Sequence, residues 1–74
     1  MTKELQDVVR EALEDIESDA ELCAAYPSVC AYATSEEYRK TIIYNAVRIM
    51  ATEKMQNPFD ALEILDTQLS DAEQ

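Results

Sequence analysis

The 74-residue sequence contains no glycine, and this absence narrows the folds that are open to the chain. Glycine supplies the positive φ angles of tight β-hairpin turns, and it lets the backbone approach phosphate groups closely. A chain without it favours helices joined by polar turns. Because 47% of the residues are apolar, we expect a folded domain despite a formal net charge of −10. A chain of this length has room for one small core only.

Residues 3–17 carry a clear helical pattern. On a helical projection the apolar side chains fall within one sector of about 140°, and acidic side chains occupy the opposite arc. Thr2 is a candidate N-cap for this helix. The apolar sector consists of Leu5, Val8, Val9, Ala12, Leu13 and Ile16.

The next segment contains a proline that divides it. Ser18 or Asp19 is predicted to cap a short second helix that ends near Ala25. Pro27 lacks a backbone donor and disfavours helical angles at the residue before it, so a further short helix is expected from Pro27 to about residue 33. A single kinked helix through the proline is the alternative.

The longest predicted helix covers about residues 35–54. Thr34 and Glu37 have the spacing of a capping box, and neither proline nor glycine occurs before Lys54. The apolar side chains of this helix spread over about 240° of its circumference, which is too wide for contact with one neighbour. We therefore expect a central helix that contacts two or more other helices, or a second copy of the protein.

Asn57 and Pro58 are typical of a helix start, and they predict a last helix from Pro58 to about Leu69. The tail, residues 70–74, is predicted to fray. The short connections between helices indicate antiparallel neighbours. The predicted fold is therefore all-α: one small acidic domain over residues 1–74, built as a compact bundle of four or five helices around the helix at about 35–54.

Charge is distributed unevenly along the chain. Residues 1–21 carry −6 and residues 55–74 carry −5, whereas residues 35–54 carry +1. Lys and Arg side chains of the central segment can pair with acids on flanking helices. A chain this acidic is repelled by nucleic acid and by anionic lipid, so we expect basic protein surfaces as partners.

Four acidic residues of the first helix recur at steps of three and four residues. Such steps place successive carboxylates about 4.5 to 6 Å apart along the helix axis, which is near the phosphate spacing of a nucleic-acid strand. This row, the acidic ridge, is therefore a candidate site for binding a partner. The alternative is that it is simply the solvated face of an amphipathic helix. The acidic ridge consists of Glu4, Asp7, Glu11 and Glu14.

The sequence lacks the residues that most catalytic sites and metal-binding sites use. It contains no histidine, which disfavours general acid–base catalysis, nucleophilic dyads and histidine-containing metal sites. No segment combines alternating oxygen ligands with the glycine that a calcium loop of the EF-hand type requires. We therefore predict a protein that is not an enzyme and that needs no cofactor and no metal.

Cys23 and Cys30 are the only cysteines. On an uninterrupted helix a seven-residue separation is about 10.5 Å of rise, which exceeds the α-carbon separation of a disulfide. Only a sharp turn at Pro27 permits the bond. We therefore expect two buried free thiols, with a disulfide, or a zinc site shared between two copies, as the alternatives.

These observations predict a small non-enzymatic binding protein. Its acidic ridge, together with acids of the last helix, would engage a basic surface on a protein partner, as an inhibitor that mimics nucleic acid would do. The alternative is a homodimeric assembly domain. No apolar run is long enough for a membrane helix and no secretory signal is present, so we expect a cytoplasmic protein. The candidate dimer surface on the central helix consists of Tyr38, Ile42, Tyr44 and Ile49.

Overall fold

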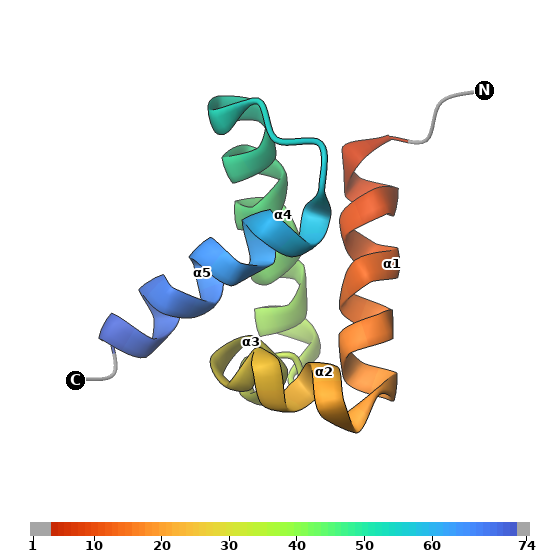
Figure 1. The fold of residues 1–74 in the computed structure, drawn as a ribbon, viewed down its shortest axis with the longest axis vertical. Helices are drawn as coiled ribbons and strands as arrows, with labels where there is room; N and C mark the ends of the chain where they lie inside the picture. Colours follow the sequence, from red (N-terminus) through yellow and green to blue (C-terminus); the bar gives the residue numbers. More distant parts are fainter. Residues whose placement is uncertain (1–3, 73–74) are drawn as a thin grey trace.

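The computed structural model of the chain describes residues 4–72, which form five helices and no strand. This architecture confirms the predicted all-α bundle (Figure 1). The described residues measure 38 × 24 × 22 Å along their principal axes. The helices are α1 (Leu5–Ser18), α2 (Ala20–Ala25), α3 (Pro27–Tyr32), α4 (Glu36–Glu53) and α5 (Pro58–Ala72).

The longest helix, α4, lies at the centre of the bundle and contacts α1, α3 and α5. Figure 1 shows α1 and α4 running side by side in opposite directions, with α5 crossing α4 and turning away from α1. The three-sided packing agrees with the wide apolar surface of the helix and confirms its predicted position. The buried residues of α4 are Ile42, Ile43, Ala46 and Met50.

The core lies between α1, α4 and α5, with a contribution from α3. Most of the predicted apolar sector of α1 is buried, whereas Val8 is half-buried and Leu5 remains 39% exposed at the start of the helix. Ala61, Leu62 and Leu65 contribute the buried face of α5. The buried residues of α1 are Val9, Ala12, Leu13 and Ile16.

The chain breaks twice between α1 and α3, close to the predicted points. Asp19 is the N-cap of α2, and its Oδ1 accepts hydrogen bonds from the backbone N–H groups of Glu21 and Leu22 at 2.9 and 3.4 Å. Tyr26 leaves the helical region before Pro27, so α2 and α3 are two separate helices. The alternative of one kinked helix is therefore wrong.

Several helix ends differ from the predictions. The N-cap of α4 is Ser35 without a side-chain hydrogen bond, and the Thr34 hydroxyl donates to the Ala31 carbonyl at 2.9 Å, so the predicted capping box does not form. At the start of α5, Asn57 Oδ1 accepts a hydrogen bond from Phe59 N–H. This helix includes residues 70–72 of the tail that was predicted to fray. The candidate cap Thr2 lies outside the described residues.

Cys23 and Cys30 form a disulfide that joins α2 to α3, so the expectation of free thiols is wrong. The break at Tyr26 folds α3 back toward α2 and brings the two α-carbons to 5.5 Å. None of the residues of α2 is buried. The disulfide therefore attaches this short helix to α3, and the half-buried Leu22 packs it against the core.

Candidate protein-binding surface

The acidic ridge lies on the outer side of α1. All of its members are exposed, opposite the buried residues of the helix. Glu4 is the N-cap of α1, and its side chain makes no capping hydrogen bond, so its carboxylate does not serve the helix end. From Glu4 to Glu14 the ridge extends about 15 Å along the axis. The structure thus presents the four predicted residues as one solvent-facing row.

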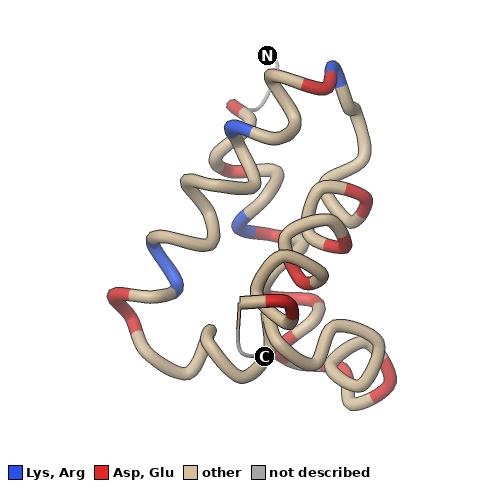
Figure 2. The backbone as a smooth tube through the Cα atoms, turned by 90° about the vertical axis from the view of Figure 1, so that its left-hand side faces the viewer, with Lys and Arg blue, Asp and Glu red and all other residues tan. Residues whose placement is uncertain are grey.

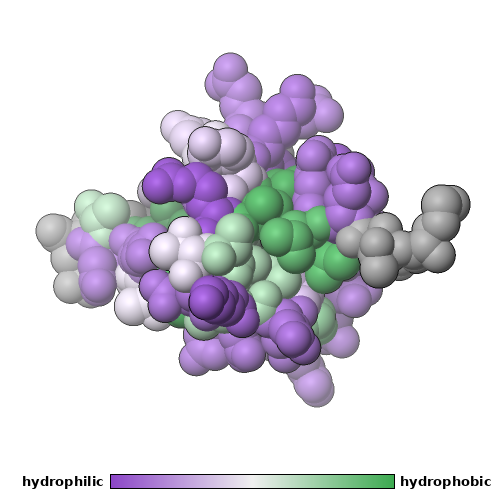
Figure 3. All heavy atoms as spheres, turned by 90° about the horizontal axis from the view of Figure 1, so that it is seen from above, coloured by the Kyte–Doolittle hydropathy of each residue, from purple (hydrophilic) through white to green (hydrophobic). Residues whose placement is uncertain are grey.

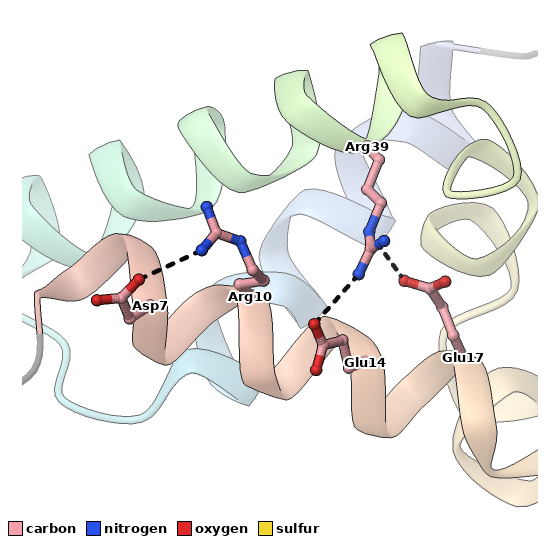
Figure 4. Close-up of polar contacts among 5 residues, drawn as sticks. All are labelled: Asp7, Arg10, Glu14, Glu17 and Arg39. Carbon is pink, nitrogen blue, oxygen red and sulfur yellow. Dashed lines mark hydrogen bonds and ion pairs between the residues drawn. The ribbon is translucent and has the colours of Figure 1, made fainter.

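Arginines lie next to part of this ridge. Asp7 pairs with Arg10 along α1 at 3.3 Å, with about half of each side chain exposed. Arg39 of α4 lies between Glu14, at 3.7 Å, and Glu17, at 3.2 Å (Figure 4). These partners offset some of the negative charge at Asp7 and Glu14. The Arg39 contacts also confirm that the central helix pairs with acids of a flanking helix.

The contact between Arg39 and Glu17 is electrostatic rather than a well-formed hydrogen bond. The Arg39 Nε atom is buried and lacks a partner with hydrogen-bond geometry, although the Glu17 carboxylate lies 3.2 Å away. Burial keeps water away from this end of the guanidinium, so its charge is balanced by the two carboxylates of α1. Arg39 therefore ties α1 to α4 directly beneath one end of the acidic ridge.

The acids of α5 form a separate group near α3. Burial raises the pKa of Tyr26, and the nearby charges of Glu63, Asp60 and Asp66 raise it further. Asp66 Oδ1 accepts a hydrogen bond from Val29 N–H at 2.8 Å, which satisfies a donor in the first turn of α3. Sequence reasoning counted Asp66 as surface charge and missed this role, since the two residues are far apart in the chain.

The acids of α5, which were predicted to act together with the acidic ridge, lie on a helix that diverges from α1. In Figure 1 the start of α5 lies near α1, and the helix then runs away from it. Figure 2 shows acidic positions along α5 and basic positions along α4. The acidic ridge of α1 is therefore the more compact candidate surface, and the α5 acids contribute to a different part of the molecule.

The candidate dimer surface does not exist as one face. Ile42 is buried in the core with 3% of its surface exposed, because it points from α4 into the bundle. Ile49 is half-buried beside α5, in a cleft of about 290 Å³ that Ile64 also lines. Tyr38 is 55% exposed and packs edge-on against Tyr32, whereas Tyr44 is 64% exposed. Because Ile42 is buried and Ile49 is half-buried, the four residues do not form one exposed surface, and this prediction is wrong.

A different surface lies on the outer side of α4. Lys40, Tyr44 and Arg48, here called the basic stripe, follow one another at four-residue steps, and the Arg48 guanidinium lies 5.9 Å from the centre of the Tyr44 ring. A groove of about 200 Å³ opens between α1 and α4 beside Lys40 and Tyr44, whereas Arg48 lines the cleft next to α5. The groove is lined by Gln6, Lys40, Ile43, Tyr44 and Val47.

The described residues contain no cluster of three or more cysteine or carboxylate side chains arranged to hold a metal ion. Within residues 4–72, no helix combines the length and the apolar character needed to cross a membrane. Comparison with known proteins gave no further guide to function. No protein-family model, curated protein or solved structure matches this chain.

Proposed function

We propose that this protein is a non-enzymatic binding module whose acidic ridge engages a basic surface on a partner protein. The single observation that carries the proposal is the exposure of all four ridge carboxylates in one row on a helix that is anchored through its opposite face. A row held on a packed helix is pre-ordered, so little conformational entropy is lost when a partner binds it.

A nucleic-acid mimic is the concrete form of this proposal. In a protein groove that binds DNA or RNA, a row of carboxylates can take the place of the nucleic-acid phosphates. Binding then releases the ions that were associated with the charged surfaces, so the affinity falls steeply as salt is added. The ridge carboxylates repeat at about 4.5 to 6 Å, which suits such a groove. The absence of histidine and the net charge of −10 favour charge-based binding over catalysis.

The test begins with capture of binding proteins on the immobilised protein from a lysate of its source at low salt. A ridge variant with Glu4, Asp7, Glu11 and Glu14 changed to Lys is compared with a matched variant that reverses four exposed acids elsewhere. We expect one basic protein to bind the wild type and the matched variant but not the ridge variant. The matched variant carries Lys at Glu21, Glu53, Glu63 and Asp71.

Two further measurements distinguish loss of binding from loss of folding. The variant Glu4→Gln/Glu11→Gln leaves Asp7 and Glu14 beside their arginines, so it should weaken the partner while preserving the helical circular dichroism signal. Added duplex DNA or RNA should displace the partner from the wild type. A partner that the ridge variant retains, or that nucleic acid does not displace, contradicts the corresponding part of the proposal.

A further inference from the structure

In a chain with 16 acidic and 6 basic side chains, three exposed cations of residues 4–72 have no carboxylate within ion-pair distance, and two of them lie together on α4, whereas Lys54 follows the helix. Among residues 4–72, Arg10 and Arg39 have carboxylate partners, whereas Lys40 and Arg48 of the basic stripe lie within ion-pair distance of no carboxylate. Tyr44 stands between them as the most exposed large apolar side chain of the described residues. An acidic chain thus presents a cationic and aromatic surface on α4.

The basic stripe and the acidic ridge belong to the same two-helix layer. Gln6 of α1 lines the groove together with Lys40 and Tyr44, and Glu14 of the ridge reaches Arg39 on α4. Figure 4 shows α1 and α4 side by side with Arg39 of α4 reaching Glu14 of α1 between them. The layer formed by α1 and α4 therefore carries rows of opposite charge next to each other.

We infer that a second copy of this chain occupies the basic stripe with its own acidic ridge. The charges are complementary and the lengths are similar, since Lys40 and Arg48 are about 12 Å apart along α4 and the acidic ridge extends about 15 Å along α1. Because each copy carries both rows on one layer, a two-fold pair makes the contact twice. This self-complementarity favours a second copy over an unrelated acidic protein.

The groove gives this contact an apolar component. The half-buried Val47 lines it beside the exposed Tyr44, and their apolar surface is covered when a helix of the second copy lies along the stripe. Seen from above, the molecule shows an apolar area between hydrophilic residues (Figure 3), and Leu5 at the start of α1 is a further exposed apolar residue. The contact nevertheless depends mainly on charge, so it weakens when salt screens its ion pairs.

Sedimentation equilibrium tests the pairing with three charge-reversal variants of equal charge change. In about 0.1 M salt, where the repulsion between two acidic copies is screened beyond about 10 Å, we expect the wild type to form dimers. Lys40→Glu or Arg48→Glu should raise the dimer dissociation constant about tenfold. Lys54→Glu changes an exposed lysine outside the stripe and should leave the constant nearly unchanged.

A second experiment reverses the charges of the basic stripe in one variant and those of the acidic ridge in another, and then mixes the two variants. The variant Lys40→Glu/Arg48→Glu and the ridge variant with four lysines should each be monomeric, whereas a mixture of the two should form a one-to-one heterodimer. Replacing the first with Lys54→Glu in that mixture should abolish the heterodimer. The exchange restores both contacts of a two-fold pair, so rescue identifies the rows that meet.

Three results would overturn the inference: a wild type that stays monomeric at all soluble concentrations, a dimer that survives reversal of the stripe, or a mixture without rescue. The inference goes beyond the proposed function and can fail separately from it. Lys40→Glu leaves the ridge intact, so it should still bind the captured partner. A ridge-dependent partner together with a monomeric wild type would retain the proposed function and reject self-pairing.

Discussion

Single side chains decide how two helix ends are completed in this molecule. Tyr26, the N-cap of α3, offers no side-chain acceptor, and Asp66 of α5 supplies one to Val29 N–H. Lys54 ends α4 at a φ of 54°, a left-handed conformation that disfavours residues with a β-carbon. The chain has no glycine for this position, so a lysine bears the steric cost.

Removing the acceptor at Asp66 should destabilise the fold. Asp66→Ala leaves the Val29 N–H without its partner in a half-buried position, so the free energy of unfolding should fall by about 1 to 2 kcal/mol. Asp66→Asn keeps an acceptor oxygen and should lose less. Urea unfolding measures both against Asp71→Ala, an exposed acid on the same helix. Equal losses for Asp66→Ala and Asp71→Ala would refute the capping role.

Replacing Lys54 by glycine should stabilise the protein. Glycine adopts positive φ without the clash of a β-carbon, so Lys54→Gly should raise the free energy of unfolding by about 1 kcal/mol. Lys54→Ala removes the same charge and keeps the β-carbon, and it should bring no such gain. Thermal unfolding of the three proteins separates the backbone effect from the charge effect. A gain of the same size for Lys54→Ala would disprove the backbone explanation.

At the scale of elements, the short helices depend on long-range partners more than the long ones do. The six-residue helices α2 and α3 are too short to be stable alone. The disulfide between Cys23 and Cys30 links α2 to α3. In addition, Asp66 of α5 accepts a hydrogen bond from Val29 N–H of α3. In contrast, α1 and α4 bury broad apolar faces along their length.

The variant Cys23→Ser/Cys30→Ser should lose stability and loosen α2 first. Closing a loop of this short length stabilises a fold by about 2.5 kcal/mol, so the free energy of unfolding should fall by that amount. Hydrogen exchange should accelerate more in α2 than in α4. Ala24→Ser, an exposed substitution on the same helix, is the control. Two titratable thiols in the wild type unfolded without reductant would show that the bond is absent.

At the scale of the whole molecule, charge rather than a cavity distinguishes this protein. Among residues 4–72, basic residues lie mainly on α4 and at its end, and acidic residues predominate on α1 and α5 (Figure 2). Ion pairs at the surface contribute only about 0 to 1 kcal/mol each, so they do not cancel the repulsion of a net charge of −10. The folded monomer therefore bears an electrostatic cost that salt can reduce.

Moderate salt should stabilise the monomer. Raising the salt from about 0.01 M to about 0.1 M shortens the screening length from about 30 to about 10 Å, so the midpoint of thermal unfolding should rise at low protein concentration. The variant Glu53→Lys/Asp71→Lys makes the formal charge more positive by two units at each site, so the net charge changes from −10 to −6. This variant should respond less to salt. A lower midpoint for the wild type at the higher salt would contradict net repulsion.

The sequence alone determined the helices and their inward faces, because helical periodicity, caps and proline act through neighbouring residues. It therefore predicted the break at Pro27, the central position of α4 and the exposure of the acidic ridge. The acidic ridge could be predicted as an exposed surface, but its partner could not. The spacing of its carboxylates indicates a basic partner without identifying which protein that is.

Only the tertiary structure decided the contacts between residues distant in the chain. The disulfide forms because α3 folds back on α2. The hydrogen bond between Asp66 and Val29 depends on where α5 lies against α3. The ion pairs of Arg39 with Glu14 and Glu17 depend on the register of α1 against α4. The same register buried Ile42 and left Tyr44 exposed on one helix. Such contacts follow from the relative positions of packed helices, and no local pattern encodes those positions.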